Sequence, residues 1–482
     1  MTDLWTALEQ RSRDWAAMDR QNLADVVWDL YVPARFGRTG DPRALDYLYP
    51  YLNHADRAAQ IRAIRVVAQV FEGRGERALE ALQYVTQNPR NFLKDRAVSV
   101  VGAALFGTSI HRLIPVMEPY LDNRNTFIKR LAVEALGVAC RGTAHEEVLD
   151  LIDTHGRAWP EVQDMAIARV YAGQPNDTVY ERLKGRVGSQ HHVAMLIAGA
   201  GVEWFDRAYV DEFQPLVEAP PEKRRLWQRF KQRAAVHAIS RGGKGLGMHA
   251  LSKMIHLVAK RAPGHAMMSG RDYNIDPLKD VEAKNATAQN LFLGADYPSN
   301  KKGLMDLLEN GDVPTQRVAA GCIGRLAVDS DDTEVVDRLV TLAGSRNGAV
   351  KSSALFGLGL ASYSSCDERL AKICYDATSD DQTSKAAYWA IGRLFSGSGR
   401  ADVFERLSDR SRKMREKPIR RSASRPLASC YRAMGAVYKG TGSAEPFTLL
   451  MDVLSLPKHQ GYDVYRRASA QALVDVEFGG AH

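Results

Sequence analysis

The sequence predicts an all-α fold, an α-solenoid of stacked antiparallel helix pairs. One observation is a pattern with a period of about 34 residues, in which a basic residue opens a helix and small apolar residues follow it. Arg62, Arg96 and Arg130 mark this pattern at intervals of 34 residues. The other observation is glycine inside these helices, as at Gly137, where it costs about 1 kcal/mol relative to alanine. Such a glycine predicts close packing between neighbouring helices.

The elements of the first half of the chain follow one another in pairs. Residues 1–40 are expected to form two short capping helices, around 4–18 and 23–30. After them, apolar residues at helical spacing predict four helix pairs. The pairs are 44–54 with 55–73, 76–88 with 89–107, 111–123 with 125–142, and 146–156 with 159–173.

The same pattern returns in the second half. Gly324, Gly359 and Gly392, each after Ile or Leu, are spaced by 35 and 33 residues. An Asp or Asn often precedes the second helix of a pair, where its side chain can accept a hydrogen bond from an unpaired backbone N–H. The predicted N-cap residues are Asp56, Asn88, Asn125, Asp312, Asn347 and Asp380.

The second-helix pattern of a basic residue, small residues and then Leu-Gly resembles the short HEAT repeats of phycobilin lyases. The resemblance covers 41–175 and 303–396 well, and 176–302 and 397–482 loosely. It implies a structural role for the basic residues that open the second helices. These are Arg62, Arg96, Arg130, Arg317, Lys351 and Lys385. The resemblance supports the fold and does not by itself assign a function.

The pattern divides the chain into five expected segments. Capping helices at 1–40 precede HEAT-like repeats at 41–221. An irregular repeat at 222–302 combines a basic helix with an inserted helix and a long loop, a feature that is often functional. HEAT-like repeats resume at 303–408, and a basic linker with the last repeats occupies 409–482.

Two basic segments interrupt an otherwise acidic chain. The net charge of the chain is +8, but residues 222–261 carry +10 and residues 410–425 carry +7. The remaining residues therefore carry −9, the difference between +8 and +17. Such segments are candidates for binding phosphates or an acidic protein surface, although a solvated helix face explains them equally well. The candidate partner-binding or phosphate-binding residues are Arg224, Arg225, Arg229, Lys231, Arg412, Lys413, Arg415, Arg420 and Arg421.

Several other kinds of site are not indicated. The glycine-rich GGKGLG at 242–247 departs from the phosphate-binding pattern GxxxxGK[ST] and is expected to be a turn. Four histidines between 237 and 265 lack the partners of a metal site, so no metal or cofactor is expected. No Ser/His/Asp or Cys/His spacing indicates a nucleophile, and an enzyme is not indicated.

The compartment and the partner follow from composition. No apolar run is long enough to span a membrane, and five scattered cysteines without a CxxC favour reduced thiols in the cytoplasm. A solenoid offers an extended binding surface. We therefore expect a non-enzymatic scaffold or adaptor for protein partners. Two alternatives stay open: a nucleic-acid-binding HEAT protein similar to DNA glycosylases, and a phycobilin-lyase-like or chaperone role.

Overall fold

The computed structural model describes most of the chain in two compact units. The described residues are 10, 32–52, 57–74, 98, 101–186, 188–218, 226–259, 287–328, 330–415, 424–454 and 462–478. One unit comprises Arg35–Leu246, and the other comprises Gly247–His482 together with Met1–Ala34. The two units meet in sequence at GGKGLG, where residues 243–245 form the expected turn.

Helices make up the regular structure of both units. In Arg35–Leu246 they are α3 (Arg43–Leu52), α4 (Arg57–Val70), α7 (Ile110–Leu121), α8 (Thr126–Ala139), α9 (Glu146–Gly156), α10 (Pro160–Val170), α11 (Asp177–Leu183), α12 (Ser189–Ile197), α13 (Val202–Ala208), the π-helical turn η1 (Tyr209–Phe213), α14 (Gln214–Val217) and α15 (Leu226–Gly242).

In the other unit the helices are α16 (Gly247–Ala259), the 3₁₀ turn η3 (Asn290–Phe292), α18 (Tyr297–Asn310), α19 (Val313–Leu326), α20 (Thr333–Ala343), α21 (Gly348–Ala361), α22 (Glu368–Ala377), α23 (Ser384–Leu394), α24 (Ala401–Arg415), α25 (Ser424–Val437), α26 (Phe447–Leu454) and α27 (Tyr462–Phe478).

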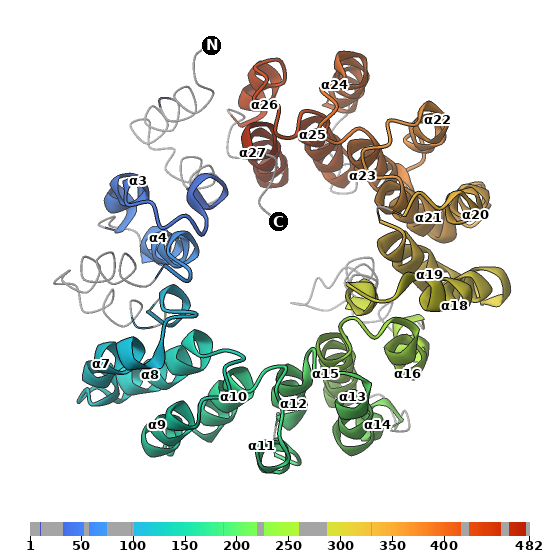
Figure 1. Ribbon diagram of the computed structural model, residues 1–482. Helices are drawn as coiled ribbons and strands as arrows, with labels where there is room; N and C mark the ends of the chain where they lie inside the picture. The colour runs from blue at the N-terminus through green and yellow to red at the C-terminus, as the bar shows by residue number, and fades with distance from the viewer. Residues whose placement is uncertain are drawn as a thin grey trace. The chain divides into compact units, whose positions relative to one another are not determined.

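These helices stack as antiparallel pairs, so the predicted all-α solenoid is confirmed. Each pair consists of a first helix and a second helix, for example α20 with α21 and α22 with α23. Within each unit the second helices pack directly on one another, whereas the first helices contact chiefly their own partners (Figure 1). The described residues contain no strand and no helix long and apolar enough to cross a membrane.

Three of the predicted N-caps begin their helices as expected. Asn125 accepts a hydrogen bond from the N–H of Phe127 at 2.9 Å. Asp312 and Asn347 cap α19 and α21 in the same way.

The prediction for Asp380 is wrong, because a short turn intervenes and Thr383 is the residue before α23. Asp380 instead accepts a hydrogen bond from the N–H of Gln382 at 2.9 Å, within that turn. The predicted caps Asp56 and Asn88 lie outside the described residues.

Glycine allows the second helices to approach until their backbones touch. A Cβ atom on Gly137 would lie 2.5 Å from the Cα of Ala166 on the next second helix. In the other unit, a Cβ atom on Gly324 would lie 2.5 Å from the Cα of Gly357. Real Cβ atoms are not found this close to another backbone, so the mid-helix glycines are required by packing. The close packing predicted at Gly137 is confirmed.

A three-residue segment after the second helix, which we call the capping loop, ties each repeat to the next. Its first and third residues have left-handed backbone conformations, with φ of +72° at Gly397 and +62° at Gly399. Their N–H groups donate to the carbonyls of Ala436 and Val437 at the end of the next second helix, each at 2.9 Å. Both carbonyls lie in the last turn of that helix, where i→i+4 partners run out, although the carbonyl of Ala436 also accepts from the N–H of Lys439 at 3.1 Å. Each repeat therefore caps the one that follows it.

The same two hydrogen bonds recur in both units. The capping loops with both bonds are 38–40, 142–144, 364–366, 397–399 and 440–442. A Thr at the middle position often adds a third bond, as when the hydroxyl of Thr441 donates to the carbonyl of Tyr438 at 2.8 Å. Loop 364–366 differs because it places Ser364 and Cys366 at φ of +55° and +54°, where the next two loops have glycine.

Replacing Gly137 with alanine tests the backbone contact. We expect Gly137→Ala to destabilise the fold by about 1–3 kcal/mol, because the new methyl group overpacks against backbone that cannot move aside. Gly303→Ala is the matched control, since its methyl group would meet only the flexible side chain of Met248 at 3.0 Å. That variant should keep or raise the melting temperature, measured by circular dichroism. Equal behaviour of the two variants would contradict the packing argument.

The third position of the capping loop, Cys366 in one repeat and Gly399 in the next, tests whether a left-handed backbone conformation costs stability there. Cys366→Gly should stabilise the fold by about 0.5–1 kcal/mol, because glycine adopts positive φ without steric strain. Gly399→Ala should destabilise it by about 1 kcal/mol for the converse reason, although a Cβ atom there would meet only the Cγ2 of Thr441, at 4.0 Å. Urea denaturation of both variants measures the effect. A loss of stability in Cys366→Gly would show that its left-handed conformation carries no strain.

Candidate functional site: a basic face on the second helices

The first basic segment of the sequence falls largely outside the residues whose side chains are described. Arg224 and Arg225 lie outside the described residues. Arg229 and Lys231 lie on α15, which is described there by its backbone alone. The structure therefore does not test the predicted stripe.

The second basic segment is split in the same way. Arg420 and Arg421 lie outside the described residues. Arg412, Lys413 and Arg415 are exposed on the last turn of α24. Arg412 pairs with Asp409 on the same helix, with Nη2 and Oδ1 2.8 Å apart and both side chains 61% exposed. Cations at this end of a helix also compensate its dipole, which accounts for them without a ligand.

A different basic surface lies on four successive second helices of the unit containing Gly247–His482, which come before the acid-bearing α27. The sequences of α19, α21, α23 and α25 contain no Asp or Glu, whereas the first helices α18, α20, α22 and α24 all contain acids. The cations of these second helices are Arg317, Arg325, Lys351, Lys385, Arg393, Arg425 and Arg432. In the other unit, α8 and α10 carry Glu134, Glu161 and Asp164 among their cations, so the segregation is not a general property of the repeats.

The glycine contacts set which positions of these helices are equivalent. Gly324, Gly359, Gly392 and Gly435 each face the next second helix at backbone distance. The residues one position later are Arg325, Leu360, Arg393 and Ala436. The residues four positions after the same glycines are Val328, Tyr363, Ser396 and Lys439. We call the surface formed by these two rows, together with Phe356, Trp389 and Arg432, the basic face.

Aromatic rings and cations pack together at the centre of the basic face. The rings of Phe356 and Trp389 stack with centroids 4.0 Å apart and planes at 20°. The Arg393 guanidinium lies over two rings, 5.0 Å from the centroid of Trp389 and 5.6 Å from that of Tyr363. Such cation–π contacts hold the Arg393 side chain in place without neutralising its charge.

Tyr363 joins three repeats at this point. The hydroxyl of Ser396 and the ammonium of Lys439 both donate to its phenolic oxygen, at 3.0 and 3.1 Å. The backbone holds Tyr363 in position, because the N–H of Ser364 donates to the carbonyl of Arg393 at 2.9 Å through the capping loop.

The pKa of Tyr363 reports the positive potential of the basic face. Burial by itself would raise this pKa, but the hydrogen bonds from Ser396 and Lys439 and the charges of Lys439 and Arg393 lower it below its ordinary value. The other described tyrosines with a shifted pKa all shift upward, for example Tyr375 to about 12, chiefly because of burial.

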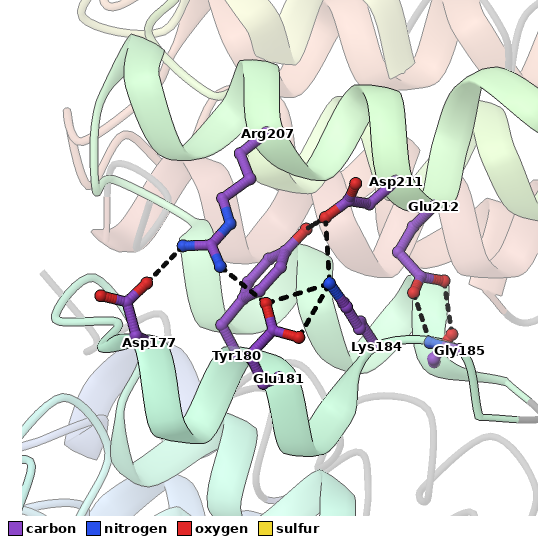
Figure 2. Close-up of polar contacts among 9 residues, drawn as sticks. Asp177, Tyr180, Glu181, Lys184, Gly185, Arg207, Asp211 and Glu212 are labelled. Carbon is purple, nitrogen blue, oxygen red and sulfur yellow. Dashed lines mark hydrogen bonds and ion pairs between the residues drawn. The ribbon is translucent and has the colours of Figure 1, made fainter.

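A second polar cluster lies on the first helices of the unit Arg35–Leu246, and its charges are largely paired (Figure 2). Arg207 binds Asp177 and Glu181 at 2.5 and 2.7 Å, and Lys184 binds Glu181 at 2.8 Å. The phenol of Tyr180 donates to Asp211 on η1 at 2.9 Å.

Glu212, also on η1, completes this cluster. It accepts hydrogen bonds from the N–H of Gly185 and the hydroxyl of Ser189, at 2.5 and 2.6 Å. The π-helical turn thus directs Asp211 and Glu212 toward α11 and the loop after it (Figure 2). These contacts join successive repeats and leave little free charge for a ligand. We therefore take the basic face as the candidate site.

Sequence reasoning did not find the basic face because its members are about one repeat apart and form no charged run. The available signal was the absence of acids from the segments that form α19, α21 and α23. Arg317, Lys351 and Lys385, which the HEAT resemblance assigns a structural role, lie on the same helices. The described residues contain no group of His, Cys, Asp and Glu that could hold a metal ion.

Comparisons with known proteins show similarity of architecture alone. No family model and no curated protein matches the sequence. Among solved structures, the karyopherin Kap121p bound to the extreme C-terminus of the protein phosphatase Cdc14p matches with 10% identity and a TM-score of 0.40, over 98% of this chain and 56% of that chain. Importin beta in a polyethylene glycol condition matches with 12% identity and a TM-score of 0.35, over 89% and 65%.

The similarity is too low to carry an argument about function. Kap121p bound to Pho4p matches with a TM-score of 0.38 at 10% identity, over 91% of this chain and 47% of that chain. In all three cases this chain spans less than two thirds of the protein it matches.

The ionisation of Tyr363 tests the potential of the basic face. We expect its pKa to lie below the ordinary value of about 10, so that tyrosinate absorbance starts to rise at lower pH than in Tyr363→Phe. Lys439→Met should raise the pKa of Tyr363, because it removes a hydrogen bond and a positive charge. Tyr375→Phe is the control and should leave the early rise unchanged. An unchanged titration curve in Tyr363→Phe would contradict the assigned environment.

Proposed function

We propose that this protein is an interaction scaffold that binds an acidic protein partner on the basic face. The observation that supports this most strongly is the charge segregation, since four successive second helices carry seven cations and no acid. Arg325, Arg393 and Arg432 form no ion pair with any described residue, so their charges are available to a partner. Complementary charge on a partner would steer its association and fix its position.

The packing of the aromatic rings favours a protein over a nucleic acid. Proteins that bind single-stranded nucleic acid use open ring faces on which bases stack. Here the rings of Phe356 and Trp389 stack on each other, and Arg393 lies over Trp389 and Tyr363. These faces are therefore largely covered before any ligand arrives.

Other readings of the sequence stay predictions. Binding of nucleic acid or protein by Arg224, Arg225, Arg229 and the residues around Arg420 is one of them. A DNA glycosylase-like activity, and a phycobilin-lyase-like or chaperone role, are others, and no described residue supports them. A cytoplasmic location also stays a prediction, with which the five free thiols of the chain are consistent.

Charge reversal tests the proposed face against a matched surface. The face variant combines Arg325→Glu, Arg393→Glu and Arg432→Glu. The control variant combines Arg412→Glu, Lys413→Glu and Arg415→Glu on α24, which changes the net charge equally. Binding of a labelled oligo-glutamate peptide is measured by fluorescence anisotropy at about 150 mM salt, where exposed charges are screened beyond about 8 Å. We expect the face variant to bind at least about tenfold more weakly and the control to bind as the wild type does.

Three other outcomes would overturn the proposal. Equal losses in the two variants would mean that net charge alone attracts the peptide. A loss confined to the control variant would move the site to α24. Labelled single-stranded DNA that binds at the same salt, and binds more tightly than the peptide, would favour the nucleic-acid alternative. Circular dichroism of each variant checks that the fold is retained.

A further inference from the structure

We infer that the partner presents an extended acidic segment to the basic face, crossing the second helices with its contact residues three positions apart. This inference rests on the proposed function and adds the conformation and sequence pattern of the bound segment. It follows from the spacing of the helices and from the side chain that each helix contributes.

The spacing between successive second helices is set by backbone contact. A Cβ atom on Gly324 would lie 2.5 Å from the Cα of Gly357, and one on Gly392 would lie 2.8 Å from the Cα of Ala433. Helices that approach this closely have axes about 8–10 Å apart. Equivalent positions on α19, α21, α23 and α25 therefore repeat at about this interval.

An extended polypeptide matches this interval in one conformation. A polyproline II segment has three residues per turn and rises about 3.1 Å per residue, so every third side chain points the same way after about 9 Å. In a β-strand the side chains on one face are about 6.6–6.8 Å apart. This spacing is shorter than the interval between the helices, so successive side chains of a strand would not meet successive helices. A polyproline II segment can therefore place one residue against each second helix in turn.

The side chains of the basic face define what each contact residue should be. Arg325 on α19 and Arg393 on α23 call for acidic residues. Between them, α21 offers no cation at this level, because Leu360 is buried and the half-buried ring of Tyr363 lies under Arg393 and Lys439, so an apolar residue suits this position better than an acid. On α25 the equivalent position is Ala436, with the exposed Arg432 one turn before it, so an acidic residue is again favoured.

The resulting pattern is acidic-x-x-apolar-x-x-acidic-x-x-acidic, in one of the two chain directions. Clustered acids would not satisfy it, because three adjacent carboxylates span only about 6–7 Å of extended chain and cannot reach three cations on helices that far apart. The pattern also distinguishes the basic face from a surface that attracts any polyanion.

Two labelled peptides of identical composition test the inference. The spaced peptide has glutamate at its first, seventh and tenth positions and leucine at its fourth, with proline and serine elsewhere, and is made in both chain directions. The clustered peptide has the same residues with its three glutamates adjacent. Fluorescence anisotropy with the full-length protein at about 150 mM salt should show that the spaced peptide, in one direction, binds about tenfold more tightly than the clustered one.

A matched pair of variants assigns the register. Arg393→Met should weaken the spaced peptide severalfold. With this variant, replacing the middle glutamate of the peptide with glutamine should reduce the affinity little further, because both changes remove the same interaction. Arg412→Met is the control and should leave the affinity unchanged. Additive effects of Arg393→Met and the glutamine-substituted peptide would place the middle glutamate elsewhere and refute the register.

The outcomes separate this inference from the function on which it rests. Equal affinity of spaced and clustered peptides, with both lost in the face variant, would overturn the spacing and leave the acidic partner in place. Failure of every acidic peptide to bind the wild-type protein would overturn both. Tighter binding of a spaced peptide whose intervening prolines are replaced by β-branched residues would contradict the polyproline II conformation.

Discussion

Successive second helices approach until the backbone of one touches the backbone of the next, and a side chain at the centre of this contact would not fit. Gly137 against Ala166 and Gly324 against Gly357 show the same solution in both units. The capping loops complete it, since the N–H groups of one repeat satisfy the last carbonyls of the following second helix. Together the two features fix the rotation and the height of each second helix relative to its neighbour. Every surface property of the repeats depends on that register.

This register separates the roles of the two helix rows. The first helices contact each other little, so long charged side chains bridge them, as Arg182 does to Asp153 and Arg369 to Asp337. The second helices are joined by backbone contact, to which an ion pair such as Arg169 with Glu134, 3.4 Å apart, only adds. Their outward residues are then free to carry one sign of charge. On α19, α21, α23 and α25 that charge is positive, and rings such as Trp389 hold the Arg393 side chain without cancelling it.

The candidate site shows why local sequence reasoning reached only part of the chain's charge pattern. The runs around 222–233 and 410–425 stand out because their cations are adjacent in the sequence. Arg325, Arg393 and Lys439 do not, since each is a single cation among apolar neighbours. They become a surface only because the glycine contacts align the same two positions of each repeat, one and four residues after the glycine. A search for helices without acids would have indicated the surface, although not which residues meet at Tyr363.

The sequence by itself determined the helices, their pairing and the small residues between them, because helical spacing, N-caps such as Asn125 and Asp312, and mid-helix glycines all act within one repeat. Tertiary structure decided the rest. Asp380 does not cap α23, because a turn the pattern did not reveal precedes that helix. Ser364 and Cys366 adopt left-handed conformations because hydrogen bonds to the next repeat require them there. The meeting of Tyr363, Ser396 and Lys439 depends on contacts across three repeats, which no single stretch of sequence contains.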